Sequence, residues 1–148
     1  NYIVNIASIC YDQNGGFFPL GSDLDGDGMS DAFEYEYFGS LTEAFPGDDF
    51  DKDGRTNYEE YVANTDPLDR QSILSIDRIE EIGGKVRVIL DETSSGRNYR
   101  LYQSDDLGIS DPWGLVAGPL PGNGGSLSLD DTKTINERGF FRVGVELP

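Results

Sequence analysis

The stretch DLDGDGMSDAFE, from Asp23 to Glu34, decides how this chain folds, and DFDKDGRTNYEE, from Asp49 to Glu60, repeats it. Both copies carry an oxygen-bearing side chain at positions 1, 3, 5, 9 and 12 and a glycine at position 6. Calcium takes about six to eight oxygen ligands, and this spacing wraps them around one point. We therefore predict two calcium sites, with the ligands Asp23, Asp25, Asp27, Met29, Asp31 and Glu34 in the first and Asp49, Asp51, Asp53, Arg55, Asn57 and Glu60 in the second.

The remaining positions of the two loops support the same interpretation. Position 7 contributes a backbone carbonyl, so the side chains of Met29 and Arg55 need not be ligands. Gly28 and Gly54 at position 6 permit backbone angles that a side chain would resist. A solvated acidic turn is the alternative, because Asp and Gly are common in turns. Two complete copies in tandem favour two bound Ca²⁺ ions over that alternative.

Each loop leads into a helix, whereas the residues before each loop oppose one. Glycines and prolines occur throughout residues 15–21, ahead of the first loop, and at Pro46-Gly47, ahead of the second. The exit helices are expected at about residues 31–38 and 57–64. Each unit is therefore a loop followed by one helix, without the entering helix of an EF-hand.

Tandem D-x-D-x-D-G-x-x-[DN]-x-x-E loops with short exit helices resemble the thrombospondin type 3-like calcium repeats of bacterial surface and secreted proteins. The closing sequence Asn64-Thr65-Asp66-Pro67-Leu68-Asp69 is similar to the end of such repeats. Dockerin modules look similar in their loop-and-helix geometry, but this chain continues into β structure, which argues against a cohesin partner. The resemblance covers residues 23–69 and implies an extracellular spacer or connector that folds with calcium.

From residue 73 the pattern changes to the two-residue period of β-strands. Strands are expected at 73–80, 85–91, 98–104, 113–117, 126–130 and 139–146. The candidate core residues on their shared faces are Val86, Val88, Leu90, Tyr99, Leu101, Leu127, Leu129, Phe141, Val143 and Val145. Six short strands predict an immunoglobulin-like or fibronectin-like β-sandwich. The closing sequence Arg138-Gly139-Phe140-Phe141-Arg142-Val143 is also similar to the β domains that follow such repeats.

The expected fold is thus mainly β with a small α calcium module, in three parts. Residues 1–22 form an N-terminal strand and a linker, residues 23–72 the tandem loop-helix repeats, and residues 73–148 the β-sandwich. The N-terminal strand covers residues 2–11 and has apolar side chains on both faces, which is typical of a buried strand. The turn-rich residues 12–22 connect it to the first loop.

Charge and composition exclude several classes of function. The chain has 28 acidic and 11 basic residues, and its net charge of −17 argues against nucleic-acid partners and anionic membranes. No apolar run approaches the length of a membrane span. Because the chain has no histidine, Ser-His-Asp triads and histidine zinc sites cannot form, and we expect no enzyme activity. Calcium loops of this kind fit millimolar extracellular calcium, so we expect an extracellular or cell-surface protein.

Three functions are compatible with this sequence. The first is a structural subunit of a filament or surface assembly, joined head to tail when the N-terminal strand inserts into the sandwich of the next copy. Six strands are one short of a seven-stranded sandwich, and the N-terminal strand could also fold back into its own. The second is a non-catalytic C-terminal accessory module of a larger secreted protein. The third is a carbohydrate-binding module with Trp113, Tyr99 and Tyr102 as its platform, although packing in the core is the favoured interpretation of these rings.

Overall fold

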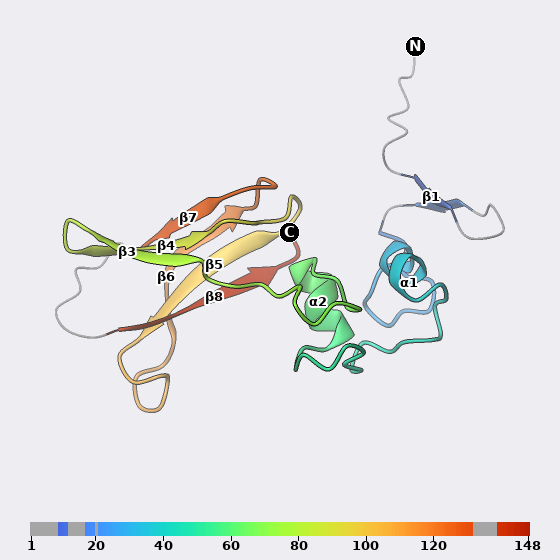
Figure 1. Cartoon of the computed structure of the whole chain (residues 1–148), viewed down its shortest axis with the longest axis horizontal. Coiled ribbons are helices and arrows are strands. Elements are labelled where there is room, and N and C mark those ends of the chain that lie inside the picture. The colour runs from blue at the N-terminus through green and yellow to red at the C-terminus, as the bar shows by residue number, and fades with distance from the viewer. Residues whose placement is uncertain (1–8, 12–16, 20, 132–138) are drawn as a thin grey trace, which may run out of the picture. The chain divides into compact units, whose positions relative to one another are not determined.

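The computed structural model describes residues 9–11, 17–19, 21–131 and 139–148, and the chain divides into two compact units (Figure 1). The N-terminal unit is Asn1–Ile73, and the C-terminal unit is Leu74–Pro148. The elements of the N-terminal unit are β1 (Ile9–Tyr11), β2 (Phe17–Pro19), α1 (Asp31–Tyr37) and α2 (Asn57–Ala63). The elements of the C-terminal unit are β3 (Arg78–Ile82), β4 (Lys85–Leu90), β5 (Asn98–Ser104), β6 (Gly114–Pro121), β7 (Leu127–Asp130) and β8 (Phe140–Glu146). The described chain is therefore mainly β, as expected, with two short helices.

A short hairpin precedes the first acidic loop. β1 and β2 pair antiparallel, with Ile9 opposite Pro19 and Tyr11 opposite Phe17. The predicted strand over residues 2–11 is confirmed for its last three residues, and residues 2–8 lie outside the described part of the chain. The prediction that residues 12–22 are only a linker was wrong, because Phe17–Pro19 is a strand. Glycines and prolines dominated that prediction, whereas the two phenylalanines favour strand pairing.

Side-chain caps fix where both helices begin. The Ser30 hydroxyl accepts a hydrogen bond from the Phe33 N–H at the start of α1. At α2, Thr56 and Glu59 form a capping box, in which each side chain accepts from the backbone N–H of the other residue. Positions 9 and 12 of each acidic loop therefore lie in the first turn of a helix, which aims both side chains back at the loop. Neither described helix has the length and apolar character that crossing a bilayer requires.

The two loop-helix repeats share a cluster of aromatic rings. The Phe33 ring centroid lies 4.8 Å from that of Tyr37 on α1 and 5.1 Å from that of Tyr61 on α2. The rings of Phe38 and Phe50 are 5.6 Å apart and extend the cluster to the second loop. These contacts pack the two repeats against each other.

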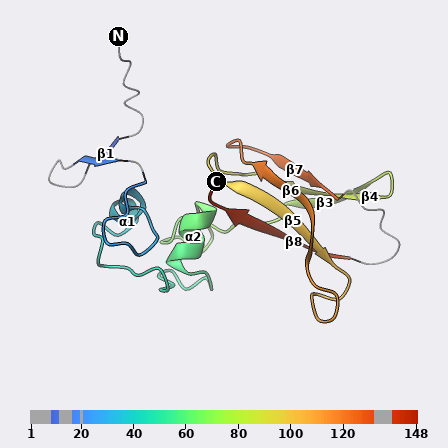
Figure 2. The same ribbon diagram turned by 180° about the vertical axis from the view of Figure 1, so that it is seen from behind.

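The C-terminal unit consists of two antiparallel three-stranded sheets, with strand orders β3-β4-β7 and β6-β5-β8 (Figures 1 and 2). The hydrophobic core is shared by both sheets and contains Val86, Val88, Leu90 and Leu129 from the first and Tyr99, Leu101 and Val116 from the second. Leu127, Phe141, Val143 and Val145 pack against it while partly buried. The residues predicted to face the core from their two-residue period are therefore confirmed.

The boundaries of two strands differ from the prediction by more than one residue. The strand expected at 73–80 begins only at Arg78, and all five residues of β3 are exposed. Leu74 and Ile76 precede β3 in the chain and pack against the core. The alternation of apolar residues there therefore reflects burial rather than pairing with another strand. β6 continues to Pro121, beyond the expected end at residue 117. Prolines are tolerated there because β6 borders its sheet and pairs only with β5 among the described strands.

Candidate metal centre

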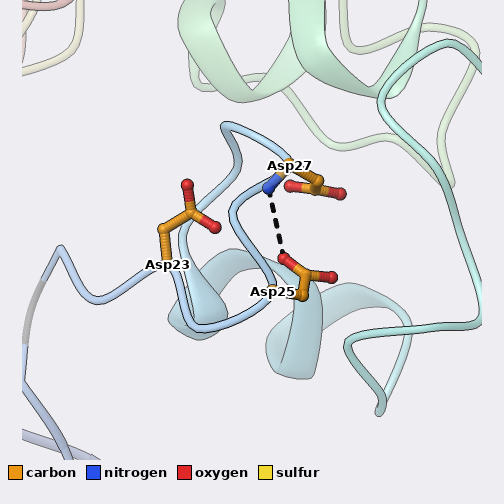
Figure 3. A group of neighbouring side chains, drawn as sticks. All are labelled: Asp23, Asp25 and Asp27. Atoms are coloured by element: carbon orange, nitrogen blue, oxygen red, sulfur yellow. Dashed lines mark hydrogen bonds between the residues drawn. The ribbon is translucent and has the colours of Figure 1, made fainter.

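Each acidic loop brings three aspartates together. Carboxylate oxygens of Asp23, Asp25 and Asp27 lie within 4.8 Å of one another, and so do those of Asp49, Asp51 and Asp53. Figure 3 shows the first group around its loop, with the hydrogen bond from the Asp27 N–H to the Asp25 carboxylate. Carboxylates packed this closely repel one another unless a cation or protons compensate their charge.

The loop backbone holds one oxygen of each aspartate in the same way in both copies. In the second loop the Asp49, Asp51 and Asp53 carboxylates accept from the N–H groups of Gly54, Asp53 and Arg55, at 3.0, 3.0 and 2.6 Å. In the first loop the equivalent bonds run from Gly28, Asp27 and Met29 to Asp23, Asp25 and Asp27, at 3.1, 3.4 and 2.9 Å. These bonds orient the carboxylates and leave the second oxygen of each for another partner, except in Asp23, whose other oxygen accepts from the Gly26 N–H at 2.8 Å.

The second loop leaves five buried oxygens without a hydrogen-bond donor, one at every predicted side-chain position. They are Asp49 Oδ1, Asp51 Oδ2, Asp53 Oδ2, Asn57 Oδ1 and Glu60 Oε2. A buried acceptor without a donor costs about 1–3 kcal/mol, and more when it is charged, so five in one loop require a partner. A cation bound by oxygen atoms is the partner that satisfies all of them.

The first loop differs at positions 1, 3 and 5, where Asp23, Asp25 and Asp27 have no buried oxygen without a donor, and also at position 9. Both oxygens of Glu34 are buried without a donor, and the side chain is fully buried. Asp31 is also fully buried, but its oxygens accept from the Leu24 N–H at 2.8 Å and from the Ser22 hydroxyl. Position 9 commonly reaches calcium through a water molecule, and Asp31 fits that indirect role.

Two residues that sequence reasoning did not single out close the loops. The Ser22 carbonyl accepts from the Asp31 N–H at 2.8 Å, and the Asp48 carbonyl accepts from the Asn57 N–H at 2.7 Å. Both residues stand one position before the first ligand, so each bond ties the start of a loop to its exit helix. The interaction uses backbone atoms, and the side chains of Ser22 and Asp48 therefore carry no common signal for it.

The position-7 residues lie in different environments. Met29 is fully buried and belongs to the small apolar core of the N-terminal unit, whereas Arg55 is exposed. Since only the carbonyl is needed at this position, the side chain is free to anchor the first loop in the core. The first loop is thereby coupled to hydrophobic packing more directly than the second.

Burial and mutual repulsion raise the pKa of the two position-12 carboxyls. The pKa of Glu34 rises from 4.5 to about 8, first because of its burial and then because of Asp27 and Asp25. The pKa of Glu60 rises from 4.5 to about 7, again mainly through burial and then through Asp51 and Asp53. Burial is also the largest cause of the raised pKa of Asp27. The metal-free loops therefore retain protons at neutral pH that a bound cation would displace.

We expect acid to stabilise the metal-free N-terminal unit. Between pH 4.5 and about 8 the unfolded chain releases the Glu34 proton while the folded chain keeps it, so rising pH favours unfolding. The Glu60 carboxyl acts in the same direction up to about pH 7. In EDTA the melting temperature should fall by several degrees between pH 5 and pH 8, as followed by far-ultraviolet circular dichroism. With saturating calcium this fall should vanish, and a rise between pH 5 and pH 8 in EDTA would contradict the burial of these carboxyls.

The aromatic residues considered for a sugar platform do not form one surface. Tyr99 is in the core, and its hydroxyl accepts from the Ser94 N–H at 2.8 Å. The Arg142 guanidinium carbon lies 5.1 Å from the Tyr102 ring centroid and 4.7 Å from that of Trp113. A cation thus occupies the space beside these two rings.

Comparison with protein-family models, curated proteins and solved structures gave no match to the chain.

Proposed function

We propose that this chain is a calcium-stabilised extracellular structural protein that binds two Ca²⁺ ions, one in each acidic loop. The observation that carries the proposal is the set of five buried, donorless oxygens at positions 1, 3, 5, 9 and 12 of the second loop. An all-oxygen site made of carboxylates, an amide and a backbone carbonyl suits calcium, whereas zinc favours nitrogen and sulfur ligands. Magnesium retains several waters and rarely fills a cage of protein ligands alone.

The bound metal would replace a hydrophobic core that the N-terminal unit largely lacks. Within residues 21–73 the buried apolar side chains are Met29, Phe33, Ala44 and Pro67. The same region buries four ligand side chains, Asp31, Glu34, Asn57 and Glu60. Free energy of metal binding is then free energy of folding, which is the behaviour implied by the resemblance to thrombospondin type 3-like repeats. Such a dependence suits millimolar calcium outside the cell.

The same proposal assigns the C-terminal unit an assembly role. Its two three-stranded sheets and shared core support an immunoglobulin-like sandwich with one strand fewer than seven. A donor strand from the N-terminus of another copy would complete it, and such a heterologous contact propagates head to tail. The calcium repeats would then be the spacer between the donor strand and the acceptor domain. No catalytic step is part of this function.

Calcium titration combined with particle sizing tests both parts of the proposal. Isothermal titration of the EDTA-treated chain should give two Ca²⁺ ions per chain, and light scattering should show oligomers or fibres in calcium. Deleting residues 1–8 should yield monomers that still bind two ions. A stoichiometry of zero Ca²⁺ ions per chain would contradict the calcium part of the proposal. A truncation that leaves particle size unchanged would contradict the donor-strand part.

A further inference from the structure

The two sheets of the C-terminal unit end in four border strands that differ in their protection. A border strand presents unpaired N–H and C=O groups, to which another strand can add. β6 contains Pro119 and Pro121, which lack an N–H group. β7 is only four residues long, and β3 carries three charged residues out of five. Prolines, short length and charge are three ways in which proteins discourage strand addition.

β8 lacks the first two protections and carries only two charged residues out of seven, Arg142 and Glu146. It is seven residues long, contains no proline and pairs with β5 along its whole length, from Phe140 opposite Ser104 to Glu146 opposite Asn98. Among the described strands it pairs with β5 alone. Both views show it along the border of its sheet (Figures 1 and 2). Its free edge is therefore the one best suited to receive an extended segment.

The core is also incompletely covered on this side of the unit. Ile79 on β3 is 56% exposed although its cross-strand partner Val88, which shares its face of the sheet, is fully buried. Val143 on β8 is only partly buried, while its partner Leu101 on β5 is fully buried. β7 contacts β5 and β6, so β3 and β8 border the opposite side. One more strand beside β8 would cover these side chains.

A segment of matching length and character lies at the start of the chain. Residues 2–8, Tyr-Ile-Val-Asn-Ile-Ala-Ser, are seven residues without a charge, and they end where β1 begins at Ile9. β1 is already paired with β2, which leaves the residues before it as the donor. Because each copy has a net charge of −17, an uncharged segment makes the contact between copies without adding repulsion.

We propose that the free edge of β8 binds residues 2–8 of a second copy of this chain as an added strand. Backbone hydrogen bonds to β8 provide the affinity, and alternate side chains provide the specificity. Tyr2, Val4 and Ile6 share one face of the segment and cover the core beside Ile79, while Ile3, Asn5 and Ala7 face outward. This inference rests on the head-to-tail assembly proposed above and names the surface that receives the donor.

Hydrogen exchange with an added peptide tests the location. The chain lacking residues 1–8, in calcium, is mixed with the synthetic peptide NYIVNIAS, and amide exchange is followed residue by residue. We expect slowed exchange at alternate residues of β8, whose N–H groups point away from β5, and unchanged exchange in β3, β6 and β7. The full-length assembly should show the same protection of β8 without added peptide.

Two matched peptides test which face is buried. The Ile6→Glu peptide places a charge against the core and should bind at least about tenfold more weakly, because a buried unpaired charge is costly. The Asn5→Glu peptide carries the same charge on the other face and should bind within about threefold of the original. Equal weakening by both substitutions would contradict the assigned orientation and, with it, the seating of the segment on β8.

Other outcomes separate this inference from the function on which it rests. If deletion of residues 1–8 abolishes assembly but the peptide protects β3, β6 or β7, the assembly function stands and the β8 site is wrong. A peptide that does not bind the truncated chain also removes the β8 site. A full-length chain that remains monomeric would contradict both the assembly function and the β8 site. This outcome includes the case in which β8 is covered by its own N-terminal segment or by residues 132–138. Calcium stoichiometry is measured separately and is unaffected by any of these results.

Discussion

Chelation of calcium should unfold residues 21–73 while residues 74–148 stay folded. The N-terminal unit buries few apolar side chains and several predicted ligand carboxylates, whereas the C-terminal unit has a hydrophobic core shared by two sheets. Trp113, the only tryptophan, belongs to the C-terminal unit and reports on it separately. Addition of EDTA at pH 8 should therefore abolish the helical circular dichroism of α1 and α2 and leave the tryptophan fluorescence spectrum unchanged.

The size of this effect follows from mass action. A site whose ligand is present at 100 times the dissociation constant stabilises the folded state by about 2.7 kcal/mol, and two such sites act together. A domain of this size shifts its melting temperature by roughly 4–8 °C for each kcal/mol. The transition of the N-terminal unit should thus move by on the order of 20 °C or more between EDTA and saturating calcium.

Magnesium at the same concentration is the control for ionic strength and charge screening. It should restore only a small part of the shift, because the five oxygens of the second loop suit a larger ion with more ligands. A melting curve that EDTA leaves unchanged would show that the donorless oxygens are satisfied without metal. Equal recovery in magnesium and calcium would show that charge screening, rather than coordination, stabilises the unit.

The Glu34→Gln substitution should change stability in opposite directions with and without calcium. In the metal-free unit Glu34 is a buried carboxyl facing a group of aspartates, so a neutral amide should raise the melting temperature at pH 8.5. In calcium the same change removes the position-12 ligand, which binds with both oxygens. Affinity of the first site should fall by more than the roughly 10–100-fold that loss of an outer-shell partner costs.

Glu36→Gln provides the matched control, because Glu36 lies on the same helix but is exposed. It should leave both the metal-free melting temperature and the calcium affinity nearly unchanged. Paired melting curves and calorimetric titrations of the two variants give the comparison directly. If Glu34→Gln destabilised the unit equally in EDTA and in calcium, its role would be packing rather than ligation.

The acidic loops were accessible to sequence reasoning because their interactions are local. Each backbone hydrogen bond to an aspartate at position 1, 3 or 5 spans at most five residues, and glycine at position 6 marks the turn. The positive φ of 102° at Gly28 and 97° at Gly54 agrees with the residue chosen there. Asp31 shows the limit of this reasoning, because its identity as an acidic residue does not reveal that Ser22 and Leu24 occupy its oxygens.

The β structure was less predictable because its pairing is not local. The residues facing the core follow from alternation, but β4 pairs with β7 across β5 and β6, which no periodicity specifies. The late start of β3 reflects which residues find a partner on β4, not their propensity. The β1–β2 hairpin was missed for the same reason, since Phe17–Pro19 is too short to stand out without its partner.

The positions of lysine and arginine would allow trypsin cleavage to report metal binding in the second loop. In residues 1–73 lysine and arginine occur only at Lys52, Arg55 and Arg70, and the first two lie inside that loop. The Arg70 guanidinium donates to the Lys52 carbonyl at 3.3 Å, which brings the third site to the same place. Two of the three bonds that trypsin can cut in this unit, after Lys52 and after Arg55, therefore lie where calcium would hold the backbone rigid. The rate of cleavage at these two bonds would therefore report how much of the second loop is occupied by metal. The first loop contains no lysine or arginine, so trypsin cannot cut within it.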